Sequence, residues 1–178
     1  MGGIQVLDKE MMEKQVRAGI GYDSHRWSVG RRLVLGGVDI PYQQGLLGHS
    51  DADALIHAIC DAILGAIGEG DIGAHFPDHD PAFKDISSLL LLGRVREITH
   101  NKGYRVANID ATVIIEQPKL RPYISEMIKS ISGALALAPE RVSVKAKTNE
   151  GMGFVGREEG IAAMAIALVE TLAASVIK

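Results

Sequence analysis

Residues 50–68 read SDADALIHAICDAILGAIG, and this stretch carries the clearest periodic pattern in the chain. Ser50 is a favourable helix N-cap, Asp53 three residues later makes a weak capping box, and Gly68 is a typical helix end. Between these ends the apolar residues recur at helical spacing, at Leu55, Ile56, Ile59, Ile63, Leu64 and Ile67. The pattern predicts a helix with one apolar face, which must pack against the rest of the fold.

Shorter patterns on either side predict the other elements. Strands are expected at residues 16–23, 106–115 and 142–147, and a hairpin around Gly36-Gly37 at residues 32–35 and 38–40. Further helices are expected at residues 87–102, at residues 122–135 and, in the Ala-rich segment, from about Glu158 onward. This order predicts an α/β fold, an α+β sandwich in which helices back one sheet.

Composition limits the class of protein. The chain has 178 residues, a net charge of −3 and only 4% aromatic residues, so we expect a single domain at residues 16–178, preceded by an N-terminal extension at residues 1–15. The absence of basic blocks argues against nucleic acid as a partner, and no apolar stretch is long enough to span a membrane. A single cysteine, Cys60, suits a reducing compartment, and residues 1–15 lack the apolar core of a secretory signal, so we expect a cytoplasmic protein.

Two segments could together hold a metal ion. Asp23 and His25 lie two residues apart at the end of the first predicted strand, so they point to the same side. On the helix, His49, Asp53, His57 and Asp61 are spaced by four and predict a stripe on one face. Two imidazoles and a carboxylate are a known catalytic zinc set with an open fourth position. The spacing equally allows His57 to be a core histidine and Asp23 a capping residue.

Two loops are candidates for substrate contacts. The carboxylates in the loop at residues 70–80 could accept hydrogen bonds from sugar hydroxyls, although Asx-turns between two helices explain them as well. In the loop at residues 147–157, backbone N–H groups with Lys147 and Thr148 could hold phosphate, and Glu150 could hold Mg²⁺. Considered alone, this second loop also fits a plain turn.

Taken in order, these segments resemble one enzyme family. The marks are Gly19–His25, Leu46–Asp53 running on to His57, Gly70–Gly73 with Phe76–Asp80, Gln117–Lys119, and Glu150–Gly160. Together they resemble the 2-C-methyl-D-erythritol 2,4-cyclodiphosphate synthase family of the non-mevalonate isoprenoid pathway, from Arg17 to the C-terminus. For such a protein we expect one four-stranded mixed sheet backed by helices, plus a small hairpin, assembled as a homotrimer with active sites between subunits.

The resemblance implies a reaction and its metals. Members convert 4-diphosphocytidyl-2-C-methyl-D-erythritol 2-phosphate to the 2,4-cyclodiphosphate with release of CMP. Asp23, His25 and His57 would bind one zinc ion per subunit, and Glu150 would bind Mg²⁺ or Mn²⁺. His49 and Thr148 would stabilise the transition state, and no general base is needed because the attacking phosphate is already ionised.

The resemblance also implies a substrate-binding set. It comprises Asp23, Ser24, His25, His49, Ser50, Asp71, Ile72, Gly73, Phe76, Pro77, Asp78, His79, Asp80, Ile115, Glu116, Gln117, Pro118, Lys119, Leu120, Arg121, Lys147, Thr148, Asn149, Glu150, Phe154 and Arg157. Asp71 and Gly73 would bind ribose, residues 115–121 cytosine, and residues 147–150 the diphosphate. Phe154 and Arg157 would face a central cavity that can hold an isoprenoid diphosphate. Where some members have Thr-Thr-Thr-Glu, this chain has Lys147-Thr148-Asn149-Glu150, so these contacts could differ.

Two other functions remain as alternatives. A zinc phosphohydrolase would use a metal-bound water and give a linear product. A non-catalytic protein that binds isoprenoid or nucleotide diphosphates would not need the metal ligands.

Overall fold

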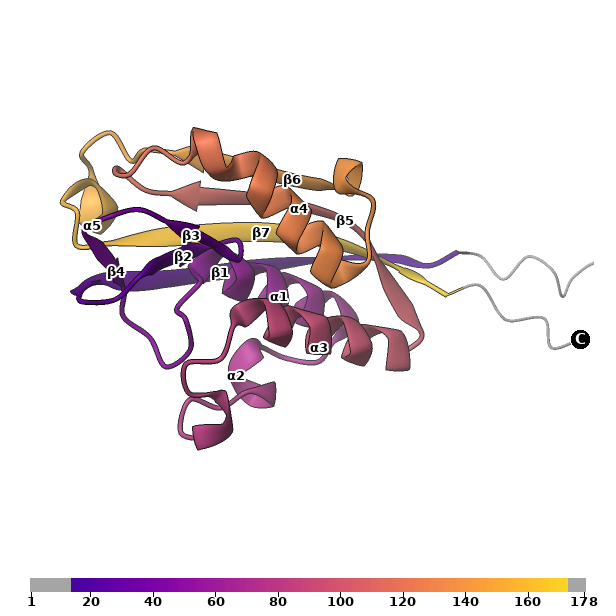
Figure 1. Ribbon diagram of the computed structural model, residues 1–178. Helices are drawn as coiled ribbons and strands as arrows, with labels where there is room; N and C mark the ends of the chain where they lie inside the picture. The colour runs from indigo at the N-terminus through magenta and orange to yellow at the C-terminus, as the bar shows by residue number, and fades with distance from the viewer. Residues whose placement is uncertain (1–13, 173–178) are drawn as a thin grey trace, which may run out of the picture.

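The computed structural model describes residues 14–172, and these form a mixed sheet of five strands in the order β4-β1-β7-β5-β6 (Figure 1). The strands are β1 (Val16–Val29), β4 (Gln44–Leu46), β5 (Tyr104–Ile114), β6 (Val142–Lys147) and β7 (Gly160–Thr171). Only β5 and β6 run parallel; every other neighbouring pair is antiparallel. The α/β class and the mixed sheet are confirmed, but the sheet has five strands instead of the predicted four.

Three longer helices pack beside this sheet. Helix α1 (Ala54–Ile67) lies against β1 and β7, α4 (Ile124–Leu135) lies against β6, and α3 (Ser88–Asn101) packs on α1 (Figure 1). Strands β2 (Leu33–Leu35) and β3 (Val38–Ile40) form the predicted separate hairpin. Short helical turns complete the chain at α2 (Ile72–His75), η1 (Pro81–Phe83), η2 (Arg121–Tyr123), η3 (Pro139–Arg141) and α5 (Gly153–Gly156).

Two glycines allow α1 to lie directly on β1. A Cβ atom at Gly21 would come within 1.9 Å of the Ala58 carbonyl oxygen, and one at Gly19 within 2.0 Å of the Ala62 carbonyl oxygen. Both positions therefore exclude any larger residue while the helix stays where it is. Side chains alternate along a strand, so Asp23 and His25 lie on the same side as these glycines and face α1. The close packing brings the predicted ligands of β1 up to His57.

The start of α1 differs from the prediction. The N-cap is Asp53, whose Oδ1 accepts from the Ile56 N–H at 3.1 Å, so the prediction of Ser50 as N-cap is wrong. The buried Asp53 carboxylate also accepts from the backbone N–H groups of Gly36 at 2.9 Å and Gly37 at 2.7 Å. It therefore satisfies donors of the β2–β3 turn and of the helix start together.

The predicted last helix is a strand. Residues 160–171 form β7, which lies between β1 and β5 in the middle of the sheet. Alanine favours a helix in isolation, but here alternate residues Ala163, Ala165 and Ala167 are buried beneath α1, where small side chains permit close packing. The remainder of that prediction, residues 173–178, lies outside the described residues.

Other predictions are confirmed within a few residues. The predicted helices at 87–102 and 122–135 correspond to α3 and to η2 with α4, and β6 has the predicted bounds. Most of the predicted extension, residues 1–13, lies outside the described residues, whereas the Gln15 N–H donates to Thr171 Oγ1 at 3.1 Å. Cys60 is fully buried in α1, and burial raises the pKa of its thiol. Among the described residues, no helix has the length and apolar character needed to cross a membrane.

Candidate active site

Asp23, His25 and His57 meet where the end of β1 passes under α1. Asp23 Oδ2 lies 2.9 Å from His25 Nε2 and 3.0 Å from His57 Nδ1. The two ring nitrogens lie 3.2 Å apart. Three atoms with metal-binding lone pairs therefore form a nearly equilateral triangle, and all three side chains are only partly accessible.

This triangle has the dimensions of one face of a tetrahedral zinc site. Zinc holds nitrogen and oxygen ligands at about 2.0–2.2 Å, so neighbouring ligand atoms of a tetrahedron lie roughly 3.3 Å apart. The observed separations of 2.9–3.2 Å are slightly shorter. A chemically suitable set of one carboxylate and two imidazoles thus fits a tetrahedral ion and leaves its fourth position free for another ligand.

The charges of the set favour a cation. Burial raises the pKa of the Asp23 carboxyl, but hydrogen bonds to His25 and His57 outweigh burial and hold the pKa well below its usual range. Burial lowers the pKa of His25, yet the adjoining Asp23 carboxylate more than compensates and leaves it above its usual value. Asp23 is therefore ionised at neutral pH, and a metal ion that binds here must displace any proton held on His25.

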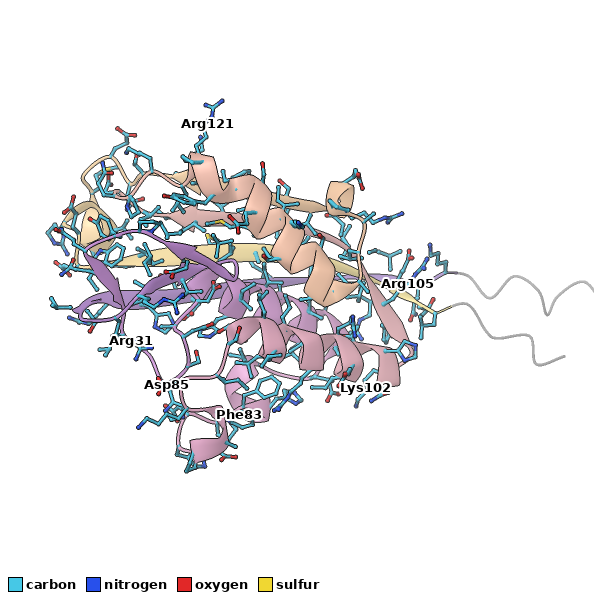
Figure 2. All side chains as sticks on the ribbon, in the orientation of Figure 1. Arg31, Phe83, Asp85, Lys102, Arg105 and Arg121 are labelled. Carbon is cyan, nitrogen blue, oxygen red and sulfur yellow. The ribbon has the colours of Figure 1, made fainter. Side chains whose placement is uncertain are left out.

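A cavity of about 570 Å³ adjoins the triad. Besides His25 and His57, ten of its lining residues belong to the segments between β4 and α1 and between α1 and α3, namely Gly48, His49, Ser50, Ile72, Gly73, Phe76, Pro77, Asp78, His79 and Phe83. All of these except Gly48 and Phe83 were predicted site residues. Phe83 ends the short helix η1, below α3 in Figure 2, and Leu91 of α3 completes the lining.

The predicted stripe along the helix is only partly correct. His49 and Asp53 precede the first residue of α1, and only His57 and Asp61 lie within the helix. The Asp61 carboxylate accepts from the Ile72 N–H at 2.8 Å and so fixes the start of the loop that lines the cavity. His49 Nε2 donates to the Asp80 carbonyl oxygen at 3.2 Å, which ties the histidine to the segment between α2 and α3.

Two carboxylates predicted to bind substrate also have local structural partners. Asp71 Oδ1 accepts from the Ala74 N–H at 2.9 Å and caps α2. Asp80 Oδ1 accepts from the Ala82 N–H at 2.9 Å and caps the short helix at Pro81–Phe83. Each carboxylate is left with a second oxygen that accepts no hydrogen bond among the described residues.

The remaining predicted residues lie elsewhere in the chain. Lys147, Thr148 and Asn149 line a separate cavity of about 370 Å³ on the open face of the sheet. Figure 2 shows Arg121 at the start of the α4 segment, on the opposite side of the molecule from Phe83. Phe154 and Arg157 lie on and just after α5, where Arg157 Nε donates to Glu159 at 2.7 Å. One chain therefore divides the predicted set between two places.

The loop beyond β6 is held by Glu116. Its Oε1 accepts from the N–H groups of Asn149 at 2.9 Å and Gly151 at 3.3 Å. Glu150 lies between these two residues with a positive φ of 51°, and its Oε1 accepts from Thr148 Oγ1 at 2.7 Å. Glu116 thus joins the predicted cytosine segment to the predicted diphosphate loop.

Comparison with known proteins agrees with this geometry. The sequence profile of the YgbB family matches residues 16–170. The chain belongs to the YgbB family. A relative in Syntrophus aciditrophicus, named 2-C-methyl-D-erythritol 2,4-cyclodiphosphate synthase, is 61% identical over 155 residues, which cover 87% of this chain and 98% of the relative.

Solved structures of similar proteins share the fold. The Plasmodium falciparum IspF in complex with CDP is 36% identical, with a TM-score of 0.78 over 89% of this chain and 97% of that one. The bifunctional IspDF of Campylobacter jejuni is 39% identical, with a TM-score of 0.86 over 89% of this chain. This YgbB chain spans 43% of the length of that bifunctional protein.

Sequence reasoning about this YgbB chain missed several groups beside the triad. The Leu47 carbonyl oxygen accepts from His25 Nδ1 at 2.6 Å. Every residue has a backbone carbonyl, so the sequence gives no sign of this partner. Ser88 Oγ lies 3.0 Å from His57 Nε2, although from the sequence Ser88 was only one residue of the helix predicted at residues 87–102. Phe83 and Leu91 line the cavity from a loop and helix whose position the sequence could not give.

Proposed function

We propose that the chain is a 2-C-methyl-D-erythritol 2,4-cyclodiphosphate synthase, which converts 4-diphosphocytidyl-2-C-methyl-D-erythritol 2-phosphate to the cyclic diphosphate and releases CMP. The observation that carries the proposal is the Asp23–His25–His57 triangle, open toward a cavity lined by His49 and Ser50. A relative at 61% identity bears the name of this activity, and a similar solved structure contains CDP. The reaction belongs to the non-mevalonate route to isoprenoids.

Asp23, His25 and His57 would hold one zinc ion per subunit, and Glu150 would hold Mg²⁺ or Mn²⁺. Bound in this way, the ions would screen repulsion between two phosphate groups and stabilise charge on their oxygens. The carboxylate–imidazole donor set supports zinc at the first site. The exposed oxygen donor of Glu150 supports a hard cation that keeps most of its ligands from substrate and water.

The residues of the chain would chiefly position the substrate. His49 and Ser50 line the cavity beside the triad, where the Ser50 hydroxyl can donate to the methylerythritol phosphate and His49 can do so by exchanging its bond to the Asp80 carbonyl oxygen for one to the substrate. His49 and Thr148 are the proposed donors to the oxygens that gain charge in the transition state. Holding the two phosphates in line can supply roughly 7–11 kcal/mol of the barrier as effective concentration. Phe76 and Phe83 pack edge to face at 5.4 Å and help to keep water out of the cavity.

The nucleotide part of the substrate would bind farther away. We assign ribose to Asp71 and Gly73, cytosine to residues 115–121, and the diphosphate to residues 147–150. Within one chain the ribose and diphosphate residues line or adjoin different cavities. We therefore infer that a complete site combines two subunits of a homotrimer.

The open face of the sheet supports this assembly. Ile20 is 66% exposed and lies directly opposite Ile166 on β7, which is 49% exposed; Tyr22 and Met164 form the next exposed pair. Four large apolar side chains on adjoining strands form a patch that a soluble monomer would rarely leave in water. The cavity beside Lys147–Asn149 borders this patch, so a neighbouring copy seated there would also approach the diphosphate loop.

Two further assignments are part of the proposal. Phe154, which is 38% exposed, and Arg157 would face a central cavity able to hold an isoprenoid diphosphate. Geranyl diphosphate binding equally to the wild type and Arg157→Ala would contradict this assignment. We also propose that residues 16–178 form a single domain. The buried thiol of Cys60 suits an enzyme of the reducing cytoplasm.

Zinc content and CMP release test the proposed function together. We expect His57→Ala to lose its zinc and at least 100-fold of its CMP release, because one ligand of three is missing. The matched control is His100→Ala, which removes an exposed histidine at the other end of the helix layer and should leave both unchanged. Full CMP release by zinc-free His57→Ala would contradict the mechanism.

Phosphorus NMR separates the cyclic product from the linear product of a phosphohydrolase, and a non-catalytic binder would release no CMP.

A further inference from the structure

Ser88 is a fully buried hydroxyl with no role in the proposed mechanism. It is the first residue of α3, and both of its polar groups turn to the same carboxylate. The Ser88 N–H donates to Asp51 Oδ2 at 2.9 Å, and the Ser88 hydroxyl donates to Asp51 Oδ1. An ionised carboxylate can only accept hydrogen bonds, so the single hydroxyl hydrogen of Ser88 is committed to Asp51.

This commitment determines what Ser88 can do for His57. Ser88 Oγ lies 3.0 Å from His57 Nε2, and with its hydrogen already donated the oxygen can only accept. Ser88 Oγ is therefore placed to accept a hydrogen carried by His57 Nε2. Ser50 Oγ, at 3.2 Å from the same nitrogen, offers a second and longer acceptor.

The other ring nitrogen, Nδ1, faces the triangle. It lies 3.0 Å from Asp23 Oδ2 and 3.2 Å from His25 Nε2. Without a metal ion Nδ1 can share a hydrogen with the Asp23 carboxylate; a metal ion bound there would take the place of that hydrogen and leave the single hydrogen of the neutral ring on Nε2. His25 is held in the same way from its far side, because its Nδ1 donates to the Leu47 carbonyl oxygen. Both rings thus turn one nitrogen to the same point.

We infer that Asp51 and Ser88 are positioning residues for the metal centre: they hold the Nε2 side of His57 so that Nδ1 faces Asp23 and His25. The inference rests on the proposed zinc site. A metal ion at Nδ1 would require the hydrogen of the neutral ring to lie on Nε2, where Ser88 can accept it. A simpler role for Asp51 would be to cap α3, whose N-cap residue Ser87 makes no side-chain cap bond.

Zinc affinity in a stable fold separates the two roles. We expect Ser88→Ala and Asp51→Asn to bind zinc 10–100-fold more weakly in competition with a chelating dye. Asp51→Asn is informative because its oxygen can still accept from the Ser88 N–H, while its amide can donate to Ser88 Oγ and free that hydroxyl to turn toward His57. The matched control is Thr99→Val, which removes another buried hydroxyl of α3, one that donates to the Val95 carbonyl oxygen. It should bind zinc like the wild type.

The contact between Ser88 and His57 provides the second readout. In nitrogen-15 NMR of the zinc-loaded protein, the signal of the His57 Nε2 hydrogen should shift in Ser88→Ala and stay in place in Thr99→Val. An unchanged signal in Ser88→Ala would overturn the inference, as would zinc affinities within twofold of wild type for both variants. If Ser88→Ala fails to fold, Asp51→Asn decides by the same two measurements. A wild type that binds no zinc would overturn the proposed function, and the inference with it.

Discussion

At the scale of single residues, the approach of β1 to α1 depends on two missing side chains. The 1.9 Å between a Cβ at Gly21 and the Ala58 carbonyl oxygen involves backbone of a buried helix, which cannot rotate away as a side chain could. Gly21 lies two residues before Asp23 on the same side of β1, so a shift of α1 at this point also moves His57 relative to its partners.

Gly21→Ala should therefore reduce both stability and zinc binding. We expect a loss of about 3 kcal/mol in the free energy of unfolding, at the upper end of the usual cost of overpacking. Urea denaturation of the zinc-free protein gives the stability, and chelator competition gives the affinity. Gly133→Ala is the control, since nothing lies within 4 Å of its added Cβ in α4, and it should stabilise by about 0.5–1 kcal/mol. Similar stabilities for the two variants would contradict the packing argument.

At the scale of elements, Asp53 links α1 to the β2–β3 hairpin. Its two oxygens accept from three backbone N–H groups, two of them in the turn between the hairpin strands. The hairpin lacks a place in the main sheet, so this carboxylate and apolar packing hold it against the helix layer.

Removal of the Asp53 side chain should be far more costly than loss of an ordinary cap. Asp53→Ala leaves three N–H groups without their acceptor, of which those of Gly36 and Ile56 are bonded in buried surroundings, and we expect a loss of about 3–4 kcal/mol in urea denaturation. Asp71→Ala removes an exposed cap of the four-residue helix α2 and should cost about 1 kcal/mol or less. Equal losses would show that the links to the hairpin contribute little.

The elements also indicate how far sequence alone could reach. The periodicity of Leu55–Ile67 and the Gly36-Gly37 turn are local signals, and both elements are present, although the helix is capped by Asp53 instead of Ser50. The prediction of a helix at residues 160–171 was wrong because their alanines favour a helix by local propensity. Burial between two strands and beneath α1 decides their structure instead. For the site, the two-residue spacing of Asp23 and His25 predicted that they share one side of a strand. Their contact with His57 depends on how closely α1 packs on β1, which the spacing of residues in the sequence does not reveal. The hydrogen-bond partners of the two histidines depend on that same packing.

At the scale of the whole molecule, the two faces of the sheet are unlike. One face is covered by helices, and the other carries Ile20, Tyr22, Met164 and Ile166 in adjoining rows. Such a patch gains free energy when another copy covers it, at about 25 cal/mol for each Å² of apolar surface buried.

A charge in the patch should therefore dissociate the proposed trimer. We expect Ile166→Asp to shift the light-scattering mass from three chains to one and to lower CMP release, because the proposed sites lie between subunits. Leu90→Asp introduces the same charge at a residue that is 61% exposed on α3 and should remain trimeric and active. A wild type that is monomeric and fully active would refute the assembly.

Strand β7 is synthesised after every strand that it joins. In the sheet order it separates β1 from β5, so the edge of each of these strands that faces β7 stays unpaired until residues 160–171 have left the ribosome. A nascent chain therefore presents two open strand edges, the kind of surface on which newly made proteins aggregate or recruit chaperones. The strand that carries Asp23 and His25 is translated well before residues 160–171, so it acquires its long antiparallel neighbour only after all the intervening segments have been made.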